Sequence, residues 1–220
     1  MTYRAERTTG HRSLSERELG VAVDNGQVSI ELCKESSAAD WLKKQGLPWW
    51  RLAVRGPVGY PKYARVRFIP DPGFPGQQAN DVEFDQKELS EKEQVGVALD
   101  LLSRYTSTPN ECYFCMWTGW DTAIPVAPNF MFSNRDYWLF RGALADYADW
   151  NDSDPARWPY GYSPDPAFIW PADRAWCVTN DVDPHFATIG ADVEAIDQIV
   201  ADQRIDAVLD DPEHEPPYWG

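Results

Sequence analysis

Apolar and polar residues alternate over two stretches in the first third of the chain. The pattern covers residues 28–32 and residues 64–69, and in the second stretch Arg65 and Arg67 occupy the polar positions. Successive side chains of a strand point to opposite faces, so an alternation of this kind is typical of a half-buried strand. It predicts two strands, the second with one basic face.

Short runs of aromatic and β-branched residues follow, each bounded by Pro, Gly, Asn or Asp. They lie at residues 112–117, 137–141, 168–170, 175–179, 186–189 and 205–208. Residues of these types favour strands, and the intervening residues favour turns. The runs predict a mostly antiparallel sheet.

Helical spacing appears in three places. Residues 91–105 carry an apolar stripe behind the capping-box pattern of Ser90 and Glu93, residues 191–201 show the same spacing, and a shorter helix starts at Ser37 and stops before Pro48. We therefore expect an α+β fold, a mostly antiparallel sheet with two to three packed helices and long aromatic and acidic loops.

The chain of 220 residues is predicted to form one domain, residues 27–209. We expect a flexible N-terminal arm at residues 1–26, with one short helix near residues 13–19, and an extended, solvated, acidic and proline-rich tail at residues 210–220.

Composition is that of a globular protein, with 43% apolar and 25% charged residues. No stretch approaches the roughly 18 consecutive apolar residues of a membrane helix, and the first 20 residues hold no apolar signal segment. The four cysteines are sparse and unpatterned, so we interpret them as reduced thiols. These features predict a cytoplasmic protein.

Charge is divided unevenly along the chain. Residues 1–70 carry 12 Lys/Arg against 7 Asp/Glu, a net +5, and residues 71–220 carry 8 against 28, a net −20. An acidic field repels phosphate, which disfavours nucleic acid and anionic membranes as partners, and it attracts a basic protein partner. The alternative is that the acidic surface only keeps the protein soluble.

Few residues suit metal binding or acid–base catalysis. Cys112 and Cys115 form a CxxC, but in a strand these positions face opposite sides, and a zinc site would also need Cys177 and His185. We predict no metal and no cofactor, since the glycine-rich loops that hold phosphates are also absent. His11 and His214 fall in the predicted arm and tail, so a mechanism based on histidine would use His185.

Aromatic residues are frequent, with 11 Trp, 10 Tyr and 9 Phe. Such rings anchor interfaces as well as cores. The region of residues 145–166 combines them with acidic residues, and we expect it to form a long loop over the sheet. The candidate binding residues of this loop are Asp149, Trp150, Asp152, Asp154 and Trp158.

Residues 170–185, with residues 189–190, 196–197 and 137–142, resemble a family of uncharacterised actinobacterial proteins. The resemblance covers roughly the C-terminal half and implies no catalytic residue and no activity.

Two functions are therefore consistent with the sequence. The first is a non-enzymatic binding protein, similar in kind to an immunity protein or a regulator, whose acidic aromatic surface engages a basic protein. The second is a small-molecule-binding protein or hydrolase with a site near Trp176, Asp181, Asp183 and His185. A deep pocket with convergent carboxylates would favour the second, and a convex acidic patch the first. The oligomeric state stays open.

Overall fold

The computed structural model describes residues 30–84, 89–119, 130–132, 135–152, 157–160 and 162–220. The predicted arm at residues 1–26, its short helix and Asp154 lie outside these residues.

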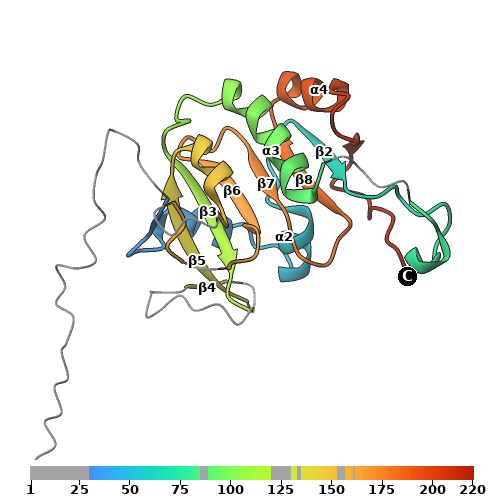
Figure 1. Ribbon diagram of the computed structural model, residues 1–220, viewed down its shortest axis with the longest axis horizontal. Helices are drawn as coiled ribbons and strands as arrows, with labels where there is room; N and C mark the ends of the chain where they lie inside the picture. Colours follow the sequence, from blue (N-terminus) through green and yellow to red (C-terminus); the bar gives the residue numbers. More distant parts are fainter. Residues whose placement is uncertain (1–29, 85–88, 120–129, 133–134, 153–156, 161) are drawn as a thin grey trace, which may run out of the picture.

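The described strands form one antiparallel sheet, whose strands are spread across the view in Figure 1. The sheet has nine strands in the described residues: β1 (Glu31–Leu32), β2 (Lys62–Arg67), β3 (Cys112–Trp117), β4 (Phe130–Phe132), β5 (Arg135–Gly142), β6 (Phe168–Pro171), β7 (Cys177–Thr179), β8 (Phe186–Ala191) and β9 (Ala207–Asp210). Their order is β1-β5-β3-β6-β7-β8-β2-β9, and β4 also pairs with β5.

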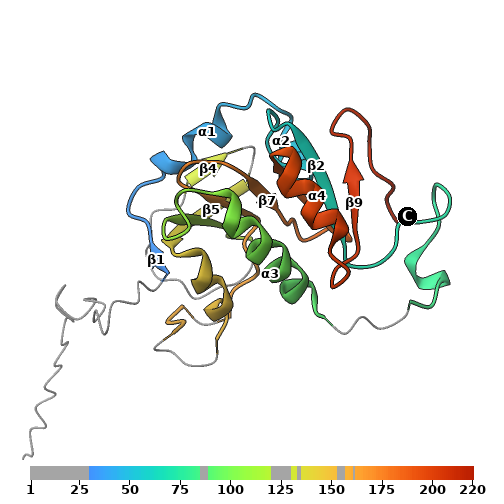
Figure 2. The same cartoon turned by 90° about the horizontal axis from the view of Figure 1, so that it is seen from above.

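Helices cover both faces of this sheet. The α-helices are α1 (Asp40–Lys43), α2 (Trp49–Arg55), α3 (Glu91–Leu102) and α4 (Val193–Ala201), and the 3-10 helices are η1 (Ser37–Ala39), η2 (Ala79–Asp81), η3 (Ser103–Tyr105) and η4 (Leu144–Asp149). Residues of α3 and α4 pack in one core and residues of α1 and α2 in the other, and Figure 2 shows α1 and α3 on opposite sides of the strands. The predicted α+β fold with a mostly antiparallel sheet is confirmed.

Successive side chains of the central strand β3 point into two separate cores. Phe114 and Met116 face the first core, which lies under α3 and α4. Cys115 faces the second core, which lies under α1 and α2. Since both faces are covered, the sheet is buried on each side, and its strands read as nearly continuous apolar runs.

The capping box predicted for the central helix is present. The Ser90 hydroxyl accepts a hydrogen bond from the Glu93 amide at 3.3 Å, and the Glu93 carboxylate accepts one from the Ser90 amide at 2.8 Å. The cap predicted at Ser37 is wrong, because Ser37 begins the 3-10 turn η1 and no side chain caps that turn. The chain turns at Gly46, whose φ of +67° suits glycine.

Helix α2 was not predicted from the sequence. Pro48 was interpreted only as the stop of the preceding helix, yet with φ −52° it stands at the N-cap of α2. Proline suits a helix start because it lacks the amide hydrogen that would go unpaired there and because its φ is already helical.

The C-terminal residues, predicted to be extended and solvated, are mostly exposed, but they contact the rest of the fold and turn where the His214 amide donates to the Asp211 carbonyl. Asp210 belongs to β9, Pro216 is buried, and the Trp219 indole donates a hydrogen bond to the Pro70 carbonyl at 3.1 Å. Within the described residues, no helix combines the length and the apolar character needed to cross a bilayer.

Helix α3 carries much of the first core, and Leu102 is fully buried there. Replacing Leu102 with Ala should lower the free energy of unfolding by about 2 to 5 kcal/mol, as large-to-small core changes do. Urea denaturation followed by circular dichroism measures this loss. Leu209→Ala is the control, because Leu209 is 55% exposed and its loss should stay within about 0.5 kcal/mol.

Candidate functional site

A groove of about 970 Å³ runs between α3 and η4. Figure 2 shows η4, in yellow-brown, beside the green helix α3. The residues that line it include Lys92, Glu93, Gly96, Val97, Asp100, Ala145, Tyr147, Ala148 and Arg204. This volume lies at the upper end of the range for ligand pockets in proteins, about 300 to 1,000 Å³.

Helix α3 can line the groove because it carries two stripes. Positions three and four apart lie on one face of a helix. The stripe that includes Val95, Ala98 and Leu102 is buried in the core, and the neighbouring stripe at Lys92, Gly96 and Asp100 faces the groove.

The opposite wall is fixed by the hydrogen bonds that begin η4. The Leu144 amide donates to the Pro109 carbonyl at 2.8 Å, and the Ala143 amide donates to the Asp146 carboxylate at 2.9 Å. Leu144 and Tyr147 then point inward, while Ala145 and Ala148 are exposed along the groove. Small side chains on this wall leave the space open.

Tyr147 lines the groove, but its hydroxyl oxygen is buried. Its side chain is buried, its ring lies 3.9 Å from the position of a Cβ on Gly96, and its hydroxyl has no hydrogen-bond partner among the described residues. Burial raises the pKa of Tyr147 well above its usual value, and the Asp165 carboxylate adds to this effect. The hydroxyl is therefore neutral at physiological pH.

The cations of the groove are already engaged. Lys92 donates to the Trp150 carbonyl, and its ammonium lies 5.9 Å from the centre of the Tyr147 ring. Arg204 binds both carboxylate oxygens of Asp202, at 3.0 and 2.8 Å. These contacts leave the cations less able to attract an anionic ligand.

The end of the groove near Asp100 is electronegative. Asp100 lies in the last turn of α3, which contains no basic residue. The carbonyl groups of a helix C-terminus carry a partial negative charge, so this carboxylate and the helix dipole add together. A cation bound there would be favoured by both.

The predicted acidic loop is only partly exposed. Asp149 and Asp152 each lie 3.3 Å from the Arg157 guanidinium, which offsets part of their charge. Asp149 ends η4 and so lies beside the groove.

The prediction that Trp150 and Trp158 are surface anchors is wrong. Both rings are buried in the first core with their centroids 4.3 Å apart, and the Trp150 indole donates to the Pro164 carbonyl at 3.0 Å. The apolar area of both rings is buried within the fold, because the rings of Trp150 and Trp158 pack against Phe140 on the sheet.

The four residues of the alternative site do not converge. Trp176 is buried in the first core before β7, while Asp181 follows β7 and binds Arg135 at 2.5 Å. Burial raises the pKa of Asp181, and Arg135 opposes that shift. Asp183 is exposed, 3.7 Å from Arg135.

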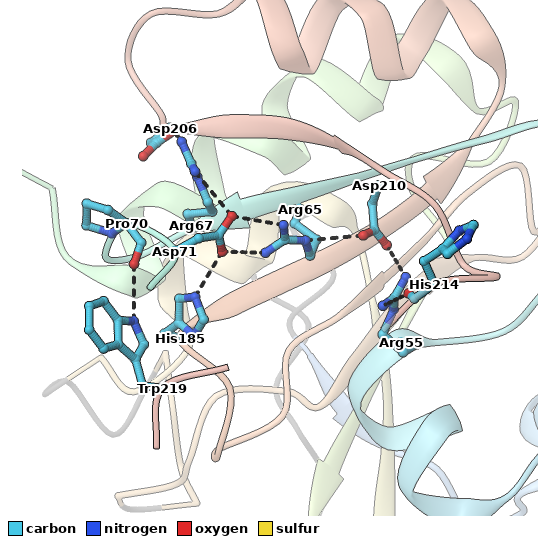
Figure 3. A network of polar contacts seen from close by, with 10 residues as sticks. All are labelled: Arg55, Arg65, Arg67, Pro70, Asp71, His185, Asp206, Asp210, His214 and Trp219. Atoms are coloured by element: carbon cyan, nitrogen blue, oxygen red, sulfur yellow. Dashed lines mark hydrogen bonds and ion pairs between the residues drawn. The ribbon is translucent and has the colours of Figure 1, made fainter. Parts of the chain in front are cut away.

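His185 turns instead toward an ionic network, drawn in Figure 3. Its Nε2 lies 3.1 Å from Asp71, which also accepts two hydrogen bonds from Arg65 at 2.7 and 3.0 Å. Arg65 reaches Asp210, and Asp210 binds Arg55 at 2.6 Å. The basic face predicted for β2 is thus covered by carboxylates of the same chain.

This network shifts the pKa values of its members. Burial alone would raise the pKa of Asp71, but hydrogen bonds from Arg65 and His185 hold it at about 2. Burial lowers the pKa of His185, and Asp71 opposes that shift. Ionised Asp71 therefore favours the folded state at neutral pH, and the lowered pKa of His185 makes the fold less stable in acid.

The cysteines have no metal-site geometry in the described residues. Cys112 lies in the first core and Cys115 and Cys177 in the second, and the described part of the chain contains no group of three or more potential metal ligands. Burial raises the pKa of Cys112 to about 12, so its thiol stays protonated.

Comparison of the chain with protein-family models, curated proteins and solved structures gives no match. The resemblance to an actinobacterial family stays a prediction, and the choice of a site rests on the geometry of this chain.

The sequence did not reveal the groove, because its two walls, α3 and η4, are formed by segments about 50 residues apart along the chain. Gly96 was the available signal, since glycine inside a helix costs about 1 kcal/mol relative to alanine and often has a packing or functional reason. Here it leaves room above the Tyr147 ring.

Asp71→Asn should lower the free energy of unfolding at pH 7 by about 1 to 2 kcal/mol, a modest loss because the carboxylate is partly solvated. The folded-state pKa of about 2 lies below the ordinary 3.8, so ionised Asp71 stabilises the fold above pH 3.8. That contribution disappears as the pH falls toward 2, and the two proteins should then converge. Urea titrations across this range measure the difference, and a gap that does not depend on pH would contradict the ionic role. Asp40→Asn, at an exposed ion pair, is the control and should have little effect.

Proposed function

We propose that this protein is a non-enzymatic binding protein of the cytoplasm that holds an extended, basic segment of a partner protein in the groove between α3 and η4. The observation that carries the proposal is the electronegative end of the groove at Asp100. The partner is still the basic protein expected from the sequence, but the docking surface is the groove along α3 and not the loop of residues 145–166.

The dimensions of the groove suit a short extended segment. Helix α3 has 12 residues, which span about 18 Å at about 1.5 Å per residue. An extended chain of five or six residues covers that length at about 3.3 Å per residue. The apolar part of the segment would lie over Val97, Ala148 and Tyr147, which all line the groove.

Charge supports a basic segment over an acidic one. Glu93 and Asp100 line the groove, and hydrogen bonds from Ser90 lower the pKa of Glu93, so its carboxylate is ionised at neutral pH. Lys92 and Arg204 are held by Trp150 and Asp202. An arginine of the partner would meet Asp100 and the C-terminal end of α3.

A second candidate is a small-molecule-binding site in the same groove. The volume of the groove favours this function. The two candidates differ in their salt dependence, because screening weakens the attraction of a basic segment but leaves that of a neutral ligand nearly unchanged.

Eight-residue peptides that carry one arginine at successive positions test the proposal by fluorescence anisotropy. Glu93→Gln with Asp100→Asn should weaken binding at least about tenfold, and raising the salt from about 0.05 to about 0.3 M should slow association of the wild type. Gln at position 93 keeps the capping box, so the fold is retained.

The matched control is Glu35→Gln with Asp81→Asn, which removes the same charge at two exposed positions away from the groove. This pair should bind as the wild type does. Ala148→Trp should block the groove, whereas Ala201→Trp, at an exposed position on α4, should not. Equal weakening by both charge pairs would show that only overall charge matters, and the groove assignment would then fail.

A further inference from the structure

The last ten residues of the sequence, 211–220, cross the face of the sheet opposite α4. They begin where β9 ends and pass α2 and the loop that follows β2. Figure 3 shows Arg55 of α2 reaching His214, and the Trp219 indole reaching the Pro70 carbonyl. We call residues 211–220 the C-terminal strap.

The strap is held mainly through its main chain. Arg55 donates to the carbonyl groups of Asp211 at 2.8 Å and of His214 at 2.9 Å, and Arg51 donates to the carbonyl of Pro212. Every residue has a main-chain carbonyl, so these two arginines recognise the path of the main chain more than a particular sequence. That path turns where the His214 amide donates to the Asp211 carbonyl at 3.1 Å.

Side-chain selectivity comes from the aromatic pair near the end of the strap. The Tyr218 ring lies 6.0 Å from Phe186, and the Trp219 ring lies 5.3 Å from Phe84 and 6.3 Å from His185. These distances are ordinary for aromatic contacts, which add to the area that the rings bury.

Little of the strap is buried. Pro216 is its one buried residue, Trp219 and Pro212 are half-buried, and the acidic residues Asp211, Glu213 and Glu215 are exposed. A segment held by polar contacts with little apolar burial opens at a lower free energy than the core. The strap is therefore the element of this face that can leave without unfolding the sheet.

The surface under the strap keeps an unused donor while the strap is bound. Arg55 is only 4% exposed, and its Nε has no hydrogen-bond partner among the described residues. Opening of the strap would also free the Arg51 guanidinium and the Phe186 ring, which lies beneath the Arg65 guanidinium at 4.8 Å.

We propose that Arg51, Arg55, Phe186 and His185 form a peptide-binding surface that the strap occupies as an internal ligand. The external ligand is an acidic, proline-containing segment of a partner protein that carries an aromatic pair after its turn, the chemistry of the strap itself. This surface lies on the face of the sheet opposite the α3 groove and does not depend on the function proposed for that groove.

A fluorescent peptide with the sequence of residues 211–220 tests the proposal on the full-length protein. Trp219→Ala weakens the internal ligand, so this variant should bind the peptide at least about tenfold more tightly than the wild type does. Adding Arg51→Ala to Trp219→Ala should remove that gain. A peptide with alanine in place of its tryptophan should bind at least about tenfold more weakly.

Tyr162→Ala is the matched control, because Tyr162 is an aromatic residue that is 79% exposed and is not part of the strap surface. It should bind the peptide as the wild type does. Equal affinity of the wild type and Trp219→Ala, or no binding by either, would overturn the proposal.

Hydrogen exchange of the unmodified chain is the second measurement, and it needs no variant. The Gly220 amide, which donates to the Gln77 carbonyl, should exchange at least about a hundredfold faster than the paired amides of β8. Protection equal to that of β8 would make the strap a fixed part of the fold and would overturn its role as a displaceable ligand.

Discussion

Strand β3 lies between β5 and β6 and sends successive side chains into two different cores, with Phe114 on one side and Cys115 on the other. Apolar area on both faces must leave water, so each face needs a covering layer. Helices α3 and α4 provide one layer and α1 and α2 the other. The groove exists because the first layer has two parts, and the small residues at Gly96, Ala145 and Ala148 leave space between them.

Around β2, at the other end of the sheet, one face is covered by paired charges. On β2, Arg65 is buried beside Phe186 and is neutralised by Asp71 and Asp210. Buried ions cost several kcal/mol each unless they are paired and hydrogen-bonded, so these groups stabilise the fold only as a set. Arg55 joins the set through Asp210 and links the ionic network to the strap. A face of this kind presents arginine N–H groups as hydrogen-bond donors, which an apolar face lacks.

The two proposed surfaces therefore follow from the two halves of one sheet. Over the apolar half, the opening between α3 and η4 is lined by Glu93 and Asp100, while its cations Lys92 and Arg204 are held by other groups of the chain, and it suits a basic segment. Over the ionic half, arginine side chains hold main-chain carbonyl groups and suit an acidic segment. A protein with both surfaces could bring two segments of opposite charge to one scaffold, which is a binding function that needs no catalytic group.

The sequence by itself determined the fold class and most of the elements. The period of two predicted β2, the capping box of Ser90 and Glu93 predicted α3, and the aromatic runs predicted the central strands, because these signals depend on neighbours within a few residues. It also placed Cys112 and Cys115 on opposite faces. Only the tertiary structure decided where each ring and charge goes. Trp150 and Trp158 read equally well as anchors or as core, and Arg65 as an exposed cation or a paired one. Their partners, Phe140 and Asp210, lie on distant strands, and no local pattern encodes which strands become neighbours.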